Sequence, residues 1–213
     1  MIHPCTRLQY INDQIGYGVF ATSLIPMGSI TYVKDSLELE IKPQDFHSYS
    51  QELQDTIEKY SYIDADGVRI VSWDFAKYVN HCCNCNTMST GYGFEIALRD
   101  ILPGEEITDE YGLFNMTNAM ELSCKYQDCR KKVSAQDIES LYIQWDAQLL
   151  PALLKIGQIE QPLLPLVDAD TKNQIFAFLD GHTTYKSVKH LQQKAALNNL
   201  SFNHNSKVMG TKI

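Results

Sequence analysis

The sequence has few basic side chains and no long apolar run. Its 213 residues include 18 lysines and arginines against 26 aspartates and glutamates, which gives a net charge of −8. The most basic stretch, Arg130-Lys131-Lys132, is too short to form the positive surface that holds a phosphate backbone, so we do not expect direct binding of DNA or RNA. No segment approaches the roughly 20 apolar residues of a membrane span, so no membrane segment is expected either.

The first residues lack the basic region and the apolar run of a secretory signal. We therefore predict a cytoplasmic location, with export that uses no cleaved signal as the alternative. The acidic balance suits a basic protein or peptide partner, because opposite potentials steer two molecules toward each other.

Cysteine is also scarce, with six in the chain. Without a secretory signal, these cysteines argue against a disulfide framework. Five of them fall in two groups, one at positions 82, 83 and 85 and the other at 124 and 129, while Cys5 stands alone. Such groups are typical either of a structural metal site or of buried thiols, and the residues by themselves leave both interpretations open.

The order of turn residues and apolar stretches predicts a mainly β domain followed by helices. Short strands are expected over 16–33, 61–75, 94–101 and 106–111, because glycine, proline and Asp66-Gly67 separate stretches rich in β-branched and aromatic residues. Apolar residues near helical spacing predict one or two short helices over 43–60. We place this domain at residues 1–133.

From residue 134 the pattern becomes helical. Ser134 is the expected N-cap of a helix with an apolar face, and further helices are expected around 171–181 and 185–200. We interpret 134–200 as a helical extension and 201–213 as a polar, flexible tail.

Three motifs stand out, and each is weak when taken alone. Gly16-Tyr17-Gly18 lacks the third glycine of a dinucleotide-binding turn, so by itself it indicates a turn. The stretch "NHCCNCN" at 80–86 is compatible with a polar turn that carries thiols. The stretch "GEEITDEYG" at 104–112 alone indicates a solvated acidic turn.

In this order and spacing, the three motifs resemble those of the SET-domain protein lysine methyltransferases over residues 10–133. That family has N-H-S-C-x-P-N in the middle and G-E-E-L-T-x-D-Y at the end. The matching residues are Asn80, His81, Cys83, Asn86, Gly104, Glu105, Glu106, Thr108 and Tyr111. The resemblance implies a β-clip-like SET fold in which the C-terminal segment is threaded through a loop, an exception to the usual rarity of threading.

The resemblance also implies the roles of the matching residues. S-adenosylmethionine is expected to lie against Gly16, Tyr17, Gly18, Asn80, His81 and Tyr111. Glycine allows the backbone to approach a cofactor closely, since no Cβ intervenes. Tyr111 is the expected catalytic residue, with its hydroxyl where the lysine nitrogen, the methyl group and the sulfur line up.

The sequence departs from the family pattern at two places. Asp109 stands two residues before Tyr111, where the family usually has Phe or Tyr, so we expect a carboxylate in the substrate channel and leave the number of methyl groups transferred open. In many members the cysteine at the Cys83 position joins three later cysteines to bind zinc. Here Cys124 and Cys129 have the required spacing, but Leu122 replaces the first of the three.

A structural zinc ion needs four ligands, so the fourth must come from elsewhere. Cys85 is the expected fourth ligand beside Cys83, Cys124 and Cys129, and Cys82 is the weaker choice because it should point away from Cys83. The competing interpretation is that the metal is lost and the thiols remain buried.

The function expected from the resemblance is methyl transfer from S-adenosylmethionine to lysine in a protein substrate. The alternative from another class is a SET-like module that binds a basic peptide or protein without methylating it. The helices after residue 134 are expected to cover the substrate groove or to form a homodimer contact, and their sequence does not choose between these roles.

Overall fold

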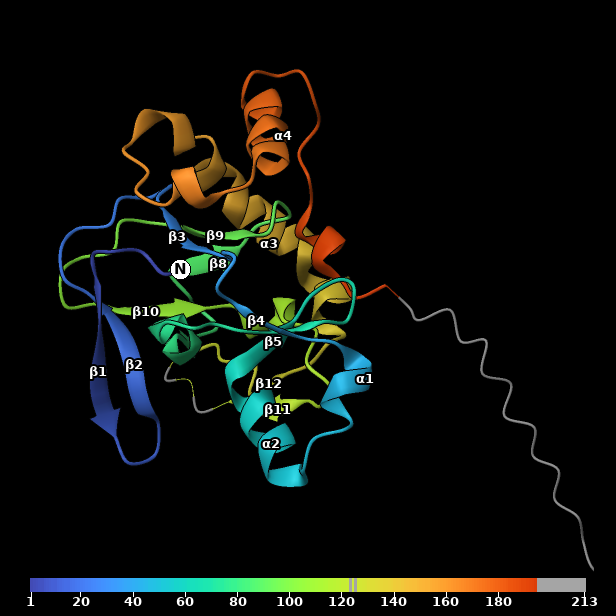
Figure 1. Ribbon diagram of the computed structural model, residues 1–213. Coiled ribbons are helices and arrows are strands. Elements are labelled where there is room, and N and C mark those ends of the chain that lie inside the picture. Colours follow the sequence, from blue (N-terminus) through green and yellow to red (C-terminus); the bar gives the residue numbers. More distant parts are fainter. Residues whose placement is uncertain (123, 125, 195–213) are drawn as a thin grey trace, which may run out of the picture.

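The computed structural model describes residues 1–122, 124 and 126–194 (Figure 1). The tail expected at 201–213 lies outside the described residues. Of the helix expected around 185–200, the described part to residue 194 forms only a single 3₁₀ turn, Val188–Leu191, so the prediction of an α-helix there was wrong for these residues. Among the described residues, no helix is both long enough and apolar enough to cross a bilayer.

The first sheet gathers segments from both ends of residues 1–112. Strands β1 (Thr6–Asn12) and β2 (Gly16–Ala21) form an antiparallel hairpin. Strand β10 (Glu106–Asp109) runs antiparallel to β2 on its other side, and β7 (Asn80–His81) runs parallel to β10. The resulting order is β1-β2-β10-β7. Strand β10 therefore lies between β2 and β7, which both precede it in the sequence.

A second sheet, in the order β3-β9-β8, packs one face against the main hydrophobic core. Its strands are β3 (Ile30–Val33), β9 (Phe94–Ala97) and β8 (Thr87–Ser89), paired antiparallel. Phe94 and Ile96 of β9 are buried, whereas Glu95 between them points to the opposite face.

Two smaller sheets complete the β structure. Strands β4 (Leu39–Ile41), β6 (Arg69–Val71) and β5 (Ser61–Ile63) form an antiparallel sheet in the order β4-β6-β5. The β5-β6 hairpin around Asp66-Gly67 confirms the turn predicted from the sequence. Strand β11 (Met120–Glu121) pairs with β12 (Lys132–Val133), and the chain between them carries Cys124 and Cys129.

The helices lie in two groups (Figure 1). Helices α1 (Pro43–Phe46) and α2 (Gln51–Tyr60) occupy the segment where short helices were expected. Helices α3 (Asp137–Leu153) and α4 (Ala169–Leu179) belong to the C-terminal extension. Single 3₁₀ turns lie at Phe75–Tyr78 (η1), Tyr111–Leu113 (η2), Ile156–Gln158 (η3), Leu164–Leu166 (η4) and Val188–Leu191 (η5).

The N-cap expected at Ser134 was wrong, because α3 begins three residues later with Gln136 in the cap position. The hydroxyl of Ser134 instead donates to the carboxylate of Asp137, 3.0 Å away, in the first turn of the helix. The short backbone turn from Ser134 to Asp137 precedes the helix and is not part of it.

The extension shares its core with the β domain and is not a separate appendage. Trp145 and Leu149 of α3 are buried in the same cluster as Ile30 and Ile96 of the second sheet. The amide of Gln161 reinforces this contact, since it donates to the carbonyl of Gly28 at 2.7 Å and accepts from the N–H of Ile30 at 2.8 Å. The mainly β fold with added helices is thus confirmed, while the threading of the C-terminal segment remains a prediction.

Candidate active site

Parallel pairing of β7 with β10 brings two of the three sequence motifs side by side. Asn80 lies opposite Thr108, and His81 lies opposite Asp109. Buried Asn86 fixes this arrangement, because its side chain donates to the carbonyl of Glu106 at 2.8 Å and accepts from the N–H of Thr108 at 2.9 Å. Segments 80–86 and 104–112 therefore form one unit, as the resemblance implied.

The third motif, Gly16 to Gly18, contacts this unit through Asn80. The amide of Asn80 donates to the carbonyl of Tyr17 at 3.1 Å and to the carboxylate of Glu106 at 2.8 Å. A Cβ atom added at Gly18 would lie 3.0 Å from the Asn80 amide nitrogen and 2.7 Å from the Glu106 carboxylate. A side chain at Gly18 would thus displace Asn80, which explains a glycine here.

His81 is buried between the strand pair and the cysteines. The N–H of Tyr111 donates to its Nδ1 at 3.2 Å, which leaves the ring proton on Nε2, 3.4 Å from the sulfur of Cys83. Burial, and then the charge of Arg130, lower the pKa of His81 to about 4. The ring is therefore neutral at pH 7 and works as a connector between Tyr111 and Cys83.

Tyr111 lies at the junction of the motifs and a cavity. Its hydroxyl donates to the carbonyl of Val79 at 2.6 Å, and its ring lies 5.0 Å from that of Phe114, centroid to centroid. Burial raises the pKa of Tyr111 far above its ordinary value, so the hydroxyl stays protonated at any pH where the protein is folded. Tyr111 is suited to orienting a nucleophile and not to taking a proton from it.

Tyr111 also lines a cavity of about 430 Å³, whose lining does not include Gly16 to Gly18 or Asn80. Aromatic side chains form much of its wall: Tyr32, Tyr60, Tyr62, Tyr111 and Phe114. Charged side chains of both signs also line it: Asp55, Glu58, Glu95 and Asp109 on the acidic side, and Lys59, Arg69 and Lys77 on the basic side. Arg69 pairs with Glu58 at 3.0 Å. A narrow aromatic cavity with acidic groups suits a long aliphatic chain that ends in a cation.

Asp109, expected in the substrate channel, does line this cavity. It is fully buried, and one of its carboxylate oxygens accepts from the N–H of Glu110 at 2.7 Å while the other has no partner among the described residues. Burial raises the pKa of Asp109 to about 6 despite an opposing interaction with Glu95. The cavity therefore contains a carboxyl group that is ready to receive a donor.

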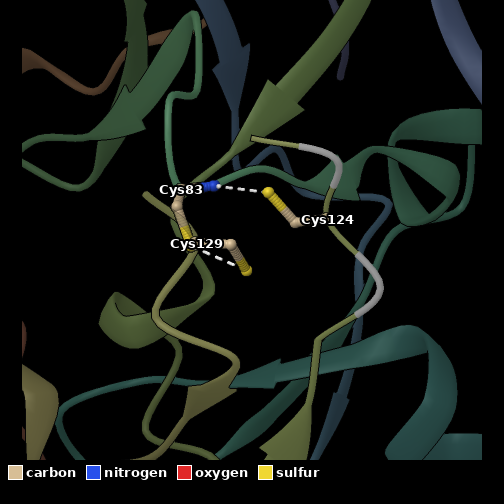
Figure 2. Close-up of side chains that lie close together, drawn as sticks. All are labelled: Cys83, Cys124 and Cys129. Atoms are coloured by element: carbon tan, nitrogen blue, oxygen red, sulfur yellow. Dashed lines mark hydrogen bonds between the residues drawn. The ribbon is translucent and has the colours of Figure 1, made fainter. Parts of the chain in front are cut away.

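Three cysteines come together beside this unit, as Figure 2 shows. The sulfur atoms of Cys83, Cys124 and Cys129 all lie within 4.8 Å of one another, close enough to share one metal ion. Backbone N–H groups point at each sulfur, from Arg130 to Cys83, from Tyr126 to Cys124 and from Lys131 to Cys129, at 3.3–3.4 Å. Such donors stabilise thiolates, which are the form that binds metal.

The structure places Cys82, and not Cys85, next to this trio. The sulfur of Cys82 lies 3.7 Å from that of Cys124 and accepts from the N–H of Asn84. Cys85 instead packs against the main hydrophobic core, and neither Cys82 nor Cys85 belongs to the group of sulfurs that all lie within 4.8 Å of one another. Cys85 lies two residues after Cys83, and its side chain faces the hydrophobic core. This placement does not support the expectation that Cys85 supplies the fourth ligand.

Sequence reasoning missed the ion pair that links the cysteines to the active site. Arg130 follows Cys129 directly, and its guanidinium donates to the carboxylate of buried Glu110 at 2.6 Å. Glu110 in turn accepts from the N–H of Gly112 at 2.8 Å and so shapes the turn that carries Tyr111. A charged residue directly before the expected catalytic tyrosine was the available signal.

Sequence reasoning also missed Glu95, which lines the cavity opposite Tyr111. Its signal was a carboxylate inside the stretch "GFEIA", which otherwise predicts a buried strand. The alternation of side chains along a strand predicts which face Glu95 occupies, but not which residues of other segments surround it there.

Comparisons with known proteins agree with this geometry. The SET domain family matches residues 16–112. A variant-silencing SET domain-containing protein of Plasmodium falciparum (isolate 3D7) is 31% identical over 135 residues, which make up 55% of this chain and 5% of that protein. The chain thus spans about one twentieth of the length of this relative.

Two solved structures are similar over part of the chain. KRYPTONITE, in complex with mCHH DNA, an H3(1–15) peptide and SAH, is 18% identical, with a TM-score of 0.44 over 60% of this chain and 29% of its own. A Plasmodium falciparum protein assigned as a histone methyltransferase is 17% identical, with a TM-score of 0.37 over 52% of this chain and 95% of its own. The residues matched by the SET domain family thus include the joined motifs, with Asn80, His81 and Tyr111 among them.

Proposed function

We propose that the protein transfers a methyl group from S-adenosylmethionine to the side-chain amine of lysine in a protein substrate. One observation carries this proposal: Tyr111 follows strand β10, which pairs with the β7 strand that carries Asn80 of the glycine–asparagine motif, and Tyr111 also lines the aromatic cavity. A reaction that joins a cofactor to a side chain needs two such compartments that meet at one residue.

The residues of the first compartment fit S-adenosylmethionine. Gly16 has a φ of +83°, which opens the turn before β2, and Gly18 leaves no side chain between the backbone and Asn80. The amide nitrogen of Asn80 is engaged, but its oxygen accepts no hydrogen bond from residues 1–122, 124 or 126–194 and is free for a donor on the cofactor. When bound, S-adenosylmethionine supplies a methyl group on a positively charged sulfur.

Tyr111 connects the two compartments. Because its hydroxyl proton is committed to the carbonyl of Val79, the oxygen presents lone pairs toward the cavity. These lone pairs accept weak C–H···O contacts from a polarised methyl group and orient the incoming amine. His81 holds the backbone of Tyr111 in place through the contact to its N–H.

The proposed substrate is a basic protein or peptide that inserts one lysine into the cavity. The net charge of −8 favours a positively charged partner, and the carboxyl groups of Glu95 and Asp109 line the cavity. The four methylenes of lysine match an aromatic wall, and the terminal cation matches the carboxyl groups at the inner end.

We further propose that the cysteine cluster holds one structural zinc ion. Three sulfurs within 4.8 Å of one another and the neighbouring Cys82 supply four thiol ligands, the number that a closed zinc site needs. Bound there, zinc would fix the segment between β11 and β12 against the strand pair of the active site.

The test is a binding titration with S-adenosylmethionine together with transfer of its labelled methyl group to core histones, used as a basic probe, and to mixed cell lysates. The proposal expects saturable binding and a labelled lysine identified by mass spectrometry. Binding without labelling of any acceptor would favour the non-catalytic module, whereas absence of cofactor binding would contradict both readings of the first compartment.

A further inference from the structure

The proposed reaction needs a proton acceptor that the SET motifs do not provide. A lysine side chain has a pKa near 10.4 and reaches the protein as an ammonium ion, which has no lone pair for attack. Tyr111 stays protonated and donates its proton to Val79, and His81 turns its ring toward Cys83 and the backbone of Tyr111. Neither residue accepts a proton from the cavity.

Glu95 is placed for this task. It projects from β9, where it lies opposite Tyr32 of β3, and it lines the cavity together with Tyr111 and Asp109. The cations nearest to it are engaged elsewhere, since Lys34 pairs with Glu40 and the amino terminus pairs with Asp35 and Glu38. Within residues 1–122, 124 and 126–194, Glu95 forms no ion pair with a cation, and its carboxyl group interacts with that of Asp109.

A second cavity, of about 150 Å³, meets the first one at Glu95. Both are lined by Tyr32, Tyr62, Ile63, Glu95 and Phe114. The second one also reaches Ser89 and the exposed Gly93 at the end of the β8-β9 hairpin. Glu95 thus lines both the substrate cavity and a second, mostly apolar cavity that extends to the exposed Gly93.

We propose that Glu95 binds the ammonium group of the substrate lysine at the inner end of the cavity, accepts one proton from it before methyl transfer, and passes that proton to solvent through the second cavity. The proposal rests on the proposed methyltransferase function. The buried carboxyl of Asp109 supports it, because it lines the same cavity, interacts with the carboxyl of Glu95, and has one oxygen with no further partner among the described residues.

The proton and electron pairs balance in this sequence. The ammonium N–H bond breaks and its proton moves to the Glu95 carboxylate, which leaves a lone pair on the lysine nitrogen. That pair forms the new N–C bond as the C–S bond breaks, and the positive charge passes from sulfur to the methylated ammonium. Glu95 then releases its proton to water, so each transfer delivers one proton to solvent.

The surroundings of Glu95 suit a proton acceptor at neutral pH. Burial, and then the charge of Asp109, raise the pKa of Glu95 well above its ordinary value. A carboxyl group with a raised pKa is a better base than an exposed one. The titratable and charged groups around Glu95 and the two cavities are the amino terminus, Tyr32, Lys34, Asp55, Glu58, Lys59, Tyr60, Tyr62, Asp64, Arg69, Lys77, Asp109 and Tyr111.

The first test uses n-butylammonium, which mimics the end of a lysine side chain, and n-butanol, its uncharged counterpart. Each is titrated by NMR into the protein saturated with S-adenosylhomocysteine. We expect the wild type to prefer the cation and Glu95→Gln to lose about tenfold in affinity for it, since a hydrogen bond to a charged group is removed. Glu160→Gln, which removes the same charge from an exposed site in the extension, should bind as the wild type does.

The second test follows turnover against pH with the acceptor found by lysate labelling. Glu95→Gln should lower turnover at pH 7 by roughly 10²–10⁴-fold and regain activity as the pH rises toward the pKa of free lysine, because the substrate then arrives deprotonated. Glu95→Asp should keep part of the activity. A merely structural role would lower turnover equally at every pH.

The outcomes separate this inference from the proposed function. No preference of the wild type for the cation, or unchanged binding and an unchanged pH profile in Glu95→Gln, overturns the role of Glu95 while methyl transfer by the wild type still stands. If Glu95→Gln does not fold, wild type and Glu95→Asp are compared on an acceptor peptide in which the less basic thialysine replaces lysine. The replacement should raise the turnover of Glu95→Asp by a larger factor than that of the wild type, and an equal factor overturns the role of Glu95.

Discussion

The guanidinium of Arg130 lies 2.6 Å from the carboxylate of Glu110, and this contact ties the cysteine cluster to the turn that carries Tyr111. Arg130 also donates its backbone N–H to the sulfur of Cys83, and its guanidinium lies 5.8 Å from the ring of Trp145 in α3. One side chain thereby joins the two candidate sites and the C-terminal extension. Burial raises the pKa of Glu110 although Arg130 opposes the effect, so desolvation is the larger influence on this carboxyl.

Removing Arg130 should destabilise the protein strongly. Arg130→Met leaves the buried carboxylate of Glu110 without its cation, and loss of one partner of a buried pair typically costs about 3–5 kcal/mol. The double variant with Glu110→Gln should recover much of this loss, because no unpaired charge remains. Urea unfolding of the single and double variants measures both values, with Lys189→Gln of the exposed Glu139 pair as a control near zero. Equal stability of Arg130→Met and wild type would contradict the prediction.

Removing the hydroxyl of Tyr111 should affect turnover and not cofactor binding. Tyr111→Phe keeps the ring against Phe114 but removes the oxygen that faces the cavity. We expect kcat to fall by roughly 10²–10⁴-fold with nearly normal affinity for S-adenosylmethionine. Labelled methyl transfer and a binding titration check this, with Tyr49→Phe at an exposed site as the matched control. Normal turnover would show that Tyr111 serves packing only.

Asn80 should contribute to cofactor affinity. Asn80→Ala removes the amide oxygen that is free to accept from the cofactor, and a donor left without its partner costs about 1–3 kcal/mol. The Kd for S-adenosylmethionine should therefore rise by about 5-fold to 150-fold. The exposed neighbour Asn84 offers the control Asn84→Ala. An unchanged Kd in a folded Asn80→Ala protein would exclude our placement of the cofactor.

The cysteine cluster should retain metal during purification. We expect about one equivalent of zinc by elemental analysis. A chelator should remove this zinc, and the 120–133 segment should then be cleaved more readily by a protease. Cys82→Ser should lose zinc more readily than Cys85→Ser, because the sulfur of Cys82 lies beside that of Cys124 whereas Cys85 packs in the core. Metal-free protein purified without chelators would favour buried thiols, and the reverse order of the two variants would restore Cys85 as the ligand.

Gln161 should hold the extension onto the second sheet. Gln161→Ala removes two hydrogen bonds and strands the backbone groups of Gly28 and Ile30, which we expect to lower the free energy of unfolding by about 1–3 kcal/mol. Gln158→Ala, three residues earlier at an exposed site, should change it by less than about 0.5 kcal/mol. Two separate unfolding transitions in urea would argue that the extension is an independent unit after all.

The local pattern of the sequence was sufficient for the elements and for the motif residues. Asp66-Gly67 predicts the β5-β6 hairpin, and the matches at Asn80, His81 and Tyr111 identify the residues that the structure brings together. These predictions succeed because turn preference, strand alternation and motif spacing depend on neighbouring residues. The start of α3 failed because Ser134 and Asp137 bond to each other before the helix begins, a choice that local preference does not resolve.

What the sequence by itself determined is therefore a SET-type arrangement of short strands, its motif residues and a cysteine cluster near residues 83, 124 and 129. Only the tertiary structure decided that Glu95 shares a cavity with Tyr111, that Arg130 pairs with Glu110, and that Cys82 lies nearer the trio than Cys85. Each of these depends on the register between segments far apart in the chain. A shift of one residue along any of these strands would turn the side chain to the other face, and no local preference encodes that choice.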